Sequence, residues 1–207
     1  MLTDKVRIAV LVSGGGTNLQ ALIDAERAGI IESGTVSLVI SNVPGAYALE
    51  RARAAKLETA VVTRADHPGA EDFESALCEL IDSRRIGLIV LAGFMRILSA
   101  DFTGKYRDRI INVHPSLIPS FCGEGFYGLR VHEAALAYGV KVTGATVHFV
   151  NEIPDGGKII MQKAVEVKDG DTAETLQRRV MEEAEWQILP RSAELVCRMI
   201  KKERENG

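Results

Sequence analysis

Two polar residues, Asn112 and His114, end an otherwise apolar run that begins at Ile110. Residues two apart in a β-strand point to the same side, so the amide and the imidazole would lie close together. Pro115 follows directly, and because proline has no N–H to donate, the strand is predicted to end there. A hydrogen-bond donor beside the one side chain that titrates near neutral pH is equipped to bind a polar ligand and exchange a proton with it.

A structural role also explains this pair. A buried His can be satisfied by a backbone carbonyl, while Asn112 closes the strand through local hydrogen bonds. Polar groups at the carboxyl end of a parallel strand nevertheless stand where ligands bind in open α/β sheets. Segment 110–115 alone is compatible with both interpretations. Residues in the other loops of the chain are needed to distinguish a ligand-binding role from a structural one.

Asp155 is a third candidate. The dipeptide Asp155-Gly156 is first of all a turn signal. It follows a predicted strand that carries Thr146 and His148, and from there its carboxylate could reach back toward His114. A carboxylate next to an imidazole favours the protonated ring and raises its pKa, as a general acid near pH 7 requires.

The remaining histidines attract less interest. His148 is expected to be a structural residue, although its position near the Asp155 loop keeps it a candidate. His67 and His132 are expected at the surface.

A glycine-rich loop, residues 13–18, reads Ser-Gly-Gly-Gly-Thr-Asn between a predicted strand and a predicted helix. Backbone N–H groups in such a loop, together with a helix N-terminus, form a cradle for a phosphate. Leu19 replaces the third Gly of a dinucleotide fingerprint, and the Gly-Lys-Ser/Thr of a P-loop is missing. The alternative is a tight turn in which Thr17 or Asn18 caps the helix.

Another loop, residues 92–98, combines Gly93 with apolar side chains around a single Arg96. Gly93 permits close approach of a ligand, and main-chain groups beside Met95, Ile97 and Leu98 could read a flat heterocycle. The competing interpretation is a strand end that runs into a helix capped by the next residue, a serine.

Strand-like and helix-like segments alternate along the chain, and these elements must position the candidate residues. Strands are predicted at 7–13, 36–41, 59–63, 87–94, 110–114, 142–151 and 159–167, the last two with the alternation of strands near a sheet edge. Helices are predicted at 18–28, 46–55, 71–83, just after Ser99, at 131–138 and at 172–204, the last broken by Pro190. The order predicts an α/β fold, an open, mostly parallel twisted sheet with helices on both faces, and residues 1–207 as a single domain.

Composition narrows the class of protein. At 46% hydrophobic, 207 residues are enough to bury a full core. A net charge of −3 argues against a non-specific nucleic-acid binder. Neither a signal peptide nor a membrane span is expected, and three scattered cysteines suit reduced thiols in the cytoplasm without a metal-ligand pattern.

Five segments resemble, in order, those of the phosphoribosylglycinamide formyltransferases, folate-dependent enzymes of purine biosynthesis. They are Ser-Gly-Gly-Gly-Thr-Asn-Leu-Gln (13–20), Leu-Ala-Gly-Phe-Met-Arg-Ile-Leu (91–98), Asn-Val-His-Pro-Ser-Leu-Ile-Pro (112–119), Gly-Ala-Thr-Val-His-Phe-Val (144–150) and Asp-Gly-Gly (155–157). The likeness extends from about residue 8 to about residue 195, nearly the whole chain.

The resemblance implies a Rossmann-like formyltransferase fold that moves a formyl group from 10-formyltetrahydrofolate to the amine of glycinamide ribonucleotide. It also implies small-molecule substrates, no metal, no nucleic-acid or membrane partner, and a monomer or homodimer. By motif match, the catalytic residues would be Asn112, His114 and Asp155. The substrate phosphate would be held by Gly16, Thr17 and Asn18, the ribose by Glu185, and the folate by Met95, Arg96, Ile97, Leu98, Asn151 and Asp155.

Three positions depart from the family pattern. Ala70 stands where the family usually has a basic residue that contacts the folate, and Trp186 stands where a His often follows the Glu. Segment 122–130 is longer than usual, so the loop beside the site is expected to close differently.

Related classes remain as alternatives. A formyltetrahydrofolate deformylase shares much of the site but usually carries an additional N-terminal domain, and a methionyl-tRNA formyltransferase usually has His-Ala-Ser where this chain has His114-Pro115-Ser116, with a further basic domain. A non-catalytic nucleotide-binding module would explain the glycine-rich loop, but it would not require Asn112, His114 and Asp155 together.

Overall fold

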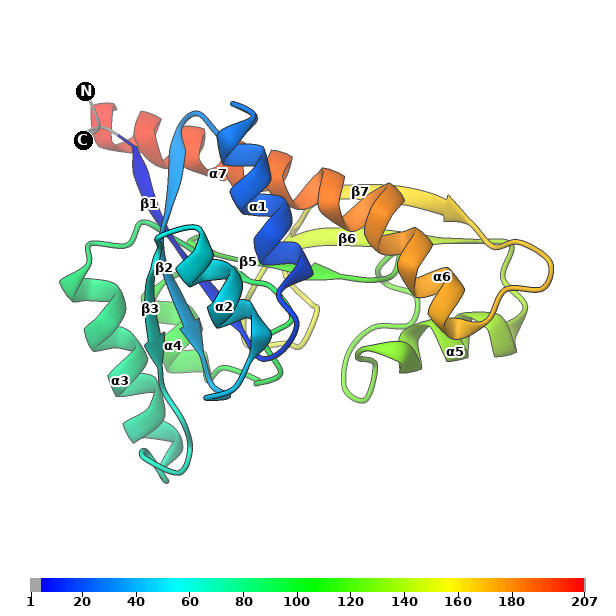
Figure 1. Ribbon diagram of the computed structural model, residues 1–207, viewed down its shortest axis with the longest axis horizontal. Helices are drawn as coiled ribbons and strands as arrows, with labels where there is room; N and C mark the ends of the chain where they lie inside the picture. Colours follow the sequence, from blue (N-terminus) through cyan, green and yellow to red (C-terminus); the bar gives the residue numbers. More distant parts are fainter. Residues whose placement is uncertain (1–4, 207) are drawn as a thin grey trace.

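One seven-stranded sheet organises the protein in the computed structural model, which describes residues 5–206 (Figure 1). The strands are β1 (Val6–Val12), β2 (Gly34–Ser41), β3 (Glu58–Val61), β4 (Leu88–Leu91), β5 (Ile110–His114), β6 (Val142–Phe149) and β7 (Ile159–Glu166), in the order β3-β2-β1-β4-β5-β6-β7. The first five pair in parallel, while β6 and β7 are antiparallel to their neighbours. The mostly parallel sheet predicted from the alternation of elements is confirmed.

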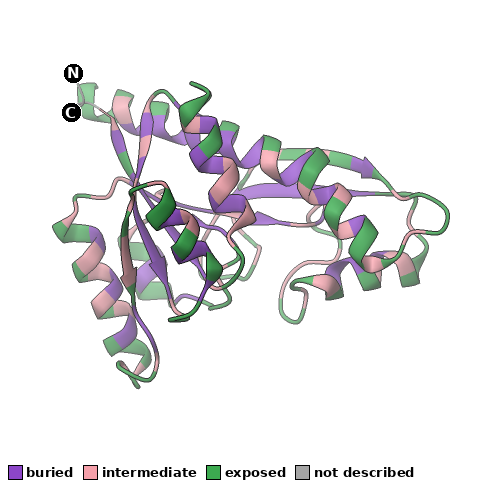
Figure 2. Ribbon diagram, viewed as in Figure 1, coloured by how far each residue is buried: buried purple, intermediate pink, exposed green. Residues whose placement is uncertain are grey.

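Helices cover both faces of the sheet. They are α1 (Thr17–Arg27), α2 (Tyr47–Ala54), α3 (Ala70–Ser83), α4 (Ala100–Lys105), α5 (Leu129–Tyr138), α6 (Ala173–Val180) and α7 (Trp186–Asn206). Apolar residues of α1, α2, α6 and α7 form one core with one face of the sheet, and those of α3 and α4 form the other core. In Figure 2 the central strands are accordingly buried, while the outer sides of the helices are exposed.

Alternation along β1 shows how one strand serves both cores. Ile8 and Val10 contribute to the core under α1 and α7, whereas Ala9 and Leu11 contribute to the core under α3. From Ile8 to Val12 neither face of this strand meets water, which is why that segment is a continuous apolar run.

The predicted elements are all present, but two details were wrong. Strand β6 does not alternate: its residues from Thr143 to His148 are all buried, because Ala145 and Val147 lie in the core under α7 while Thr146, on the other face, is bonded to the loop after β5. The last helix is not broken at Pro190, which lies inside α7. The irregularity comes earlier, in a π-helical segment, η1 (Met181–Glu185), between α6 and α7.

The position of η1 fits the chemistry of Pro190. A proline has no N–H to donate to the carbonyl four residues earlier, and its ring crowds that carbonyl. For Pro190 this carbonyl belongs to Trp186, the residue directly after the π segment. The wider turn therefore lies next to the site of the missing hydrogen bond, and the helix continues through the proline.

Candidate active site

The pairing of β5 with β6 brings four polar side chains together. Its antiparallel register sets Asn112 opposite His148 and His114 opposite Thr146. Because residues two apart share a face, the amide and both imidazoles gather on one side of the strand pair. Asn112 and His148, 36 residues apart in sequence, thus become neighbours in the sheet.

Asn112, His148 and Asp155 form a connected network. The Nδ1 atom of His148 lies 2.8 Å from the carbonyl of Phe149, which only accepts, so Nδ1 carries the ring proton and Nε2 is left as an acceptor. Asn112 Nδ2 donates toward this Nε2 at 3.3 Å and toward Asp155 Oδ1 at 3.5 Å. His148, expected to be a structural residue, therefore orients the Asn112 amide, which in turn reaches Asp155.

His114 lies between a carbonyl and a carboxylate. Its Nε2 is 2.8 Å from the carbonyl of Phe121, so Nε2 is the protonated nitrogen of the neutral ring. Its Nδ1 faces Asp155 Oδ2 at 3.5 Å, which is longer than a direct hydrogen bond. Nδ1 is therefore the atom that takes up a proton, with a carboxylate beside it to stabilise the resulting imidazolium.

The direction of the His114 pKa differs from the expectation. Burial lowers this pKa below its ordinary value, and the charge of Asp155 and the hydrogen bond to Phe121 raise it by less. A raised pKa was predicted from the neighbouring carboxylate alone, and that prediction was wrong because the ring is only 5% exposed. In the free protein His114 is a neutral imidazole near pH 7.

Asp155 is held in place by its backbone and by the opposite loop. Its φ of 55° lies in the left-handed region, which Asp tolerates better than most residues. Gly123 N donates to Oδ2 at 2.8 Å. Burial acts to raise the pKa of Asp155, but its contact with His148, the charge that His114 carries when protonated and the Gly123 N–H lower it below its ordinary value. The carboxylate is therefore ionised at neutral pH.

Thr146 fixes the loop that follows β5. Its buried hydroxyl donates to the carbonyl of Ser116 at 2.6 Å and accepts from Ile118 N at 3.1 Å and from Gln162 Nε2 at 3.0 Å. This loop carries the Phe121 carbonyl that holds His114. Thr146 and Gly123 were missed as supporting residues, because their roles depend on contacts across loops that no sequence spacing reveals.

A cavity of about 880 Å³ opens beside this network, at the carboxyl ends of β4 and β5. Its lining includes all the predicted catalytic and folate residues, together with Asn18 and Glu185. Gly16 and Thr17, which were predicted to hold the phosphate, are not among the lining residues. A smaller hollow of about 510 Å³ lies at the opposite end of the sheet, where β1 to β3 begin.

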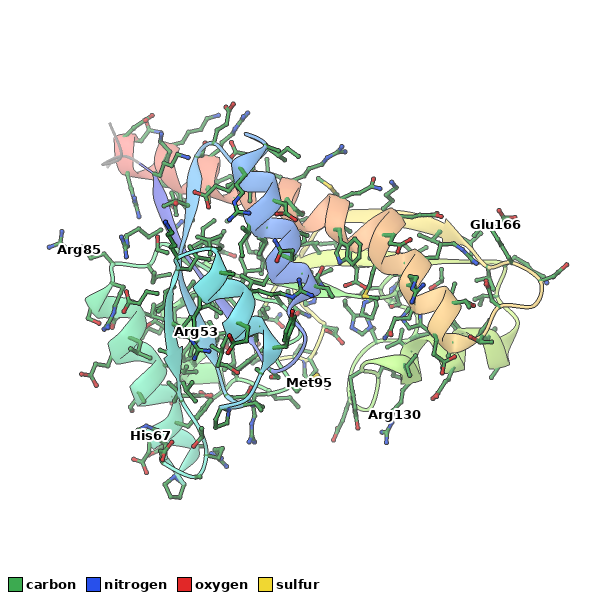
Figure 3. All side chains as sticks on the ribbon, viewed as in Figure 1. Arg53, His67, Arg85, Met95, Arg130 and Glu166 are labelled. Atoms are coloured by element: carbon green, nitrogen blue, oxygen red, sulfur yellow. The ribbon has the colours of Figure 1, made fainter. Side chains whose placement is uncertain are left out.

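The loop after β4 forms one wall of the cavity. Met95, Arg96 and Ile97 are exposed and Leu98 is buried. Ser13 Oγ accepts from Met95 N at 2.8 Å and so ties this loop to the glycine-rich loop. Met95 lies near the centre of the molecule, whereas His67 lies at its outer edge, as Figure 3 shows.

Asn151 lines the opposite wall of the cavity. Its side-chain oxygen accepts from Ile153 N at 3.0 Å, which stabilises the turn that leads to Asp155. In the free protein the amide oxygen thus serves the loop, and the amide nitrogen is the group available to a ligand.

The glycine-rich loop enters α1 through Gly16. This residue, and not Thr17 or Asn18, is the N-cap, with φ 72° and no side-chain cap. A Cβ on Gly16 would lie 2.6 Å from Ala48 Cβ in α2. Glycine is therefore required for packing against α2 and for its dihedral angle, not for the approach of a phosphate to its α-carbon.

A Gly16→Ala variant is expected to lose about 2 kcal/mol of stability or more, since an L-residue at this dihedral costs about 1–2 kcal/mol before the clash is counted. Chemical denaturation should show the loss. Gly15→Ala is the matched control, because its Cβ would meet nothing within 4 Å and its stability should stay within about 0.5 kcal/mol of the wild type. Equal stability of the two variants would contradict this account of Gly16.

Glu185 lies at the end of η1 and is only 6% exposed. Its Oε2 accepts from Asn18 Nδ2 at 2.7 Å, which joins the start of α1 to the π segment. Burial raises the pKa of Glu185 to about 7, and the Asn18 hydrogen bond opposes this rise.

His132 was predicted to lie at the surface, and this prediction was wrong. The residue is fully buried on α5. The helix packs against α6. Burial first, and then the charge of His114, lowers the pKa of His132 to about 4. Neither ring nitrogen has a hydrogen-bond partner among the described residues. His132 is thus a neutral residue behind the site.

Residues 5–206 contain neither a candidate metal centre nor a candidate membrane span. Within this part of the chain no group of His, Cys, Asp and Glu side chains is arranged to hold a metal ion. None of its helices combines the length and the hydropathy needed to cross a membrane.

Comparison with known proteins adds independent findings. A family model described as formyl transferase matches residues 6–193. The chain is 41% identical over 184 residues to phosphoribosylglycinamide formyltransferase of Haemophilus influenzae, covering 89% of this chain and 84% of that protein. It is 45% identical over 195 residues to the trifunctional purine biosynthetic protein adenosine-3 of Gallus gallus, covering 94% of this chain but 19% of that longer protein.

The fold leads to the same group of proteins. Glycinamide ribonucleotide transformylase 1 from Symbiobacterium toebii matches with a TM-score of 0.88 and 43% sequence identity, over 95% of this chain and 89% of that chain. Phosphoribosylglycinamide formyltransferase from Brucella melitensis matches with a TM-score of 0.85 and 40% identity, over 93% and 96% of the two chains.

Proposed function

The chain belongs to the formyl transferase family, and from this premise we propose that it transfers a formyl group from 10-formyltetrahydrofolate to the amine of glycinamide ribonucleotide. The products are formylglycinamide ribonucleotide and tetrahydrofolate, so the reaction belongs to purine biosynthesis, as the names of the relatives suggest. The observation that carries the proposal is the network of Asn112, His114, His148 and Asp155 on the wall of one cavity.

The chemistry begins with attack of the substrate amine on the formyl carbon. The carbonyl oxygen becomes an oxyanion and the attacking nitrogen becomes positively charged. Asn112 Nδ2 has its two N–H groups near Nε2 of His148 and Oδ1 of Asp155 at long range, and it is free to turn one of them to the oxyanion. One such donor is worth about 10²–10³ in rate.

Proton transfer completes the reaction. The charged amine gives its proton to Nδ1 of His114, and the imidazolium then gives this proton to the folate nitrogen as the bond from that nitrogen to the formyl carbon breaks. Asp155 stabilises the imidazolium in between, because an ionised carboxylate 3.5 Å from Nδ1 favours the charged ring. His114 begins and ends the cycle neutral, which agrees with its lowered pKa in the free protein.

Binding of the two substrates divides the cavity. The folate lies against Met95, Arg96, Ile97 and Leu98 on one wall and against Asn151 and Asp155 on the other. The ribonucleotide lies toward Asn18 and Glu185, with its phosphate at the backbone N–H groups where α1 begins. The volume of about 880 Å³ is at the upper end of the usual range for ligand sites and suits a site shared by two substrates.

The proposal is tested by offering the purified protein 10-formyltetrahydrofolate with three acceptors in parallel. Formylation of glycinamide ribonucleotide, at a rate far above that with water or with methionyl-tRNA, is expected. Formate release that does not depend on the ribonucleotide would instead identify a deformylase. Formylation of the tRNA would identify a methionyl-tRNA formyltransferase. No reaction with any acceptor would contradict the proposed function.

A further inference from the structure

Helix α2 lies beside the start of α1 (Figure 1) and is bonded to the glycine-rich loop at two points. Ala48 N, in the first turn of α2, donates to the carbonyl of Gly14 at 3.0 Å. Arg51 Nε, three residues further along the helix, donates to the carbonyl of Gly15 at 2.8 Å. Two successive carbonyls of the loop therefore point toward α2.

The N–H groups of this part of the loop face the opposite way. In a trans peptide the carbonyl of one residue and the N–H of the next are antiparallel, so the N–H groups of Gly15 and Gly16 point away from α2. Neither N–H has an acceptor within residues 5–206. Gly16 has left-handed dihedral angles and Thr17 begins the helix, and this alternation turns successive N–H groups toward one side, as in an anion-binding nest.

The Arg51 side chain is held by three contacts. Besides its bond to Gly15, the guanidinium donates to Gln20 Oε1 at 3.3 Å and lies over the ring of Tyr47, 5.0 Å from its centroid. In the described part of the chain no carboxylate forms an ion pair with it. Arg51 thus brings a fixed positive charge to the carbonyl side of the loop, where it polarises the peptide between Gly15 and Gly16 and strengthens the N–H as a donor.

We propose that Arg51 is a positioning residue for the phosphate of the substrate: through its bond to Gly15 it orients the Gly16 N–H toward the phosphate oxygens. The guanidinium lies on the carbonyl side of that peptide and the phosphate on its N–H side, so Arg51 acts through the peptide and not as a direct ligand. This inference rests on the proposed function, because it requires a phosphate-bearing acceptor beside Asn18 on the cavity wall. It extends the phosphate subsite from the glycine-rich loop to α2.

The test uses Arg51→Met, which has a long side chain without the donors or the charge. Formyl transfer is measured with glycinamide ribonucleotide and with glycinamide riboside, which lacks the phosphate. The variant should lose about tenfold in kcat/KM with the ribonucleotide, through KM and not through kcat, because a hydrogen bond from a charged group no longer holds the loop. With the riboside, kcat/KM should change by less than about twofold, and so should the KM of the folate.

Inorganic phosphate, used as a competitive inhibitor against the ribonucleotide, provides the second readout. Its inhibition constant should rise about tenfold in Arg51→Met. Arg53→Met is the matched control, because it removes the same groups from the exposed side of α2, where Arg53 pairs with Glu50, and it should match the wild type in all these measurements. Arg51→Lys keeps the charge but not the fixed planar donors, so it should show the same selectivity to a smaller extent. It serves as the test if the Met variant does not fold.

Two results would overturn the inference. In the first, the Arg51 variant that folds leaves kcat/KM with the ribonucleotide unchanged, or lowers it in the same proportion as kcat/KM with the riboside, as a purely structural role of Arg51 predicts. In the second, the inhibition constant of phosphate in that variant equals that of the wild type. Failure of the proposed function looks different, because the wild-type protein would then formylate neither acceptor.

Discussion

A His114→Ala variant is expected to lose about a thousandfold in turnover while it still folds and binds the folate. The reason is that, in the proposed mechanism, Nδ1 of His114 moves the proton from the attacking amine to the departing folate nitrogen, and general acid–base catalysis contributes about 10²–10⁴ in rate. Single-turnover formyl transfer gives the rate of the chemical step, and calorimetric titration gives the affinity for the folate.

A loss of turnover in His114→Ala could also result from unfolding, so the stability of the variant has to be measured as well. Removal of the ring leaves the carbonyl of Phe121 without its donor, which costs about 1–3 kcal/mol. Cooperative unfolding in denaturant should therefore persist at a lower midpoint. His67→Ala, at the outer edge of the molecule, should leave both turnover and folate affinity unchanged. Turnover near that of the wild type in a folded His114→Ala protein would remove the imidazole from the mechanism.

Asp155→Asn should change the pH dependence of the reaction as well as its rate. The ionised carboxylate raises the pKa of His114 against the effect of burial, so its loss must move this pKa further down. The acidic limb of the pH–rate profile, where His114 has to be neutral to accept a proton, should move to lower pH. Because the imidazolium is also less stable, the rate should fall about tenfold for each pKa unit lost.

The substitution is informative because the shape of the side chain is preserved. Asn tolerates the φ of 55° at this position, and its carbonyl oxygen can still accept from Gly123 N. Stability should therefore change little. Asp169→Asn, on an exposed turn, is the matched control for loss of one negative charge. A profile of Asp155→Asn that overlays the wild type would show that Asp155 serves only as a turn residue.

Much of the candidate site could be predicted because it depends on local rules. The spacing of Asn112 and His114 by two residues places them on one face of a strand whatever the rest of the fold does. Pro115 ends the strand in any sheet. The position of Asp155 could also be predicted, since a turn directly after a strand keeps its residues close to the end of that strand.

Other features depend on tertiary packing and could not be predicted in this way. His132 looks like a surface residue until α6 covers α5. The pKa of His114 depends on how deeply the ring is buried, and the neighbouring carboxylate alone suggests the wrong direction. A Cβ on Gly16 would clash with α2, and the position of α2 cannot be predicted from the sequence of the glycine-rich loop.

The π-helical segment before α7 has a consequence for how this protein can vary. A π segment holds one residue more than the α-helical stretch that would replace it, and each residue of an α-helix turns the chain by about 100°. Loss of a single residue between Met181 and Glu185 would let the segment relax to a regular helix and turn the carboxylate away from Asn18. Related chains should thus keep the length of this stretch and the Glu at its end, while the exposed residues Glu182 and Glu183 exchange freely, so that gaps in an alignment fall elsewhere.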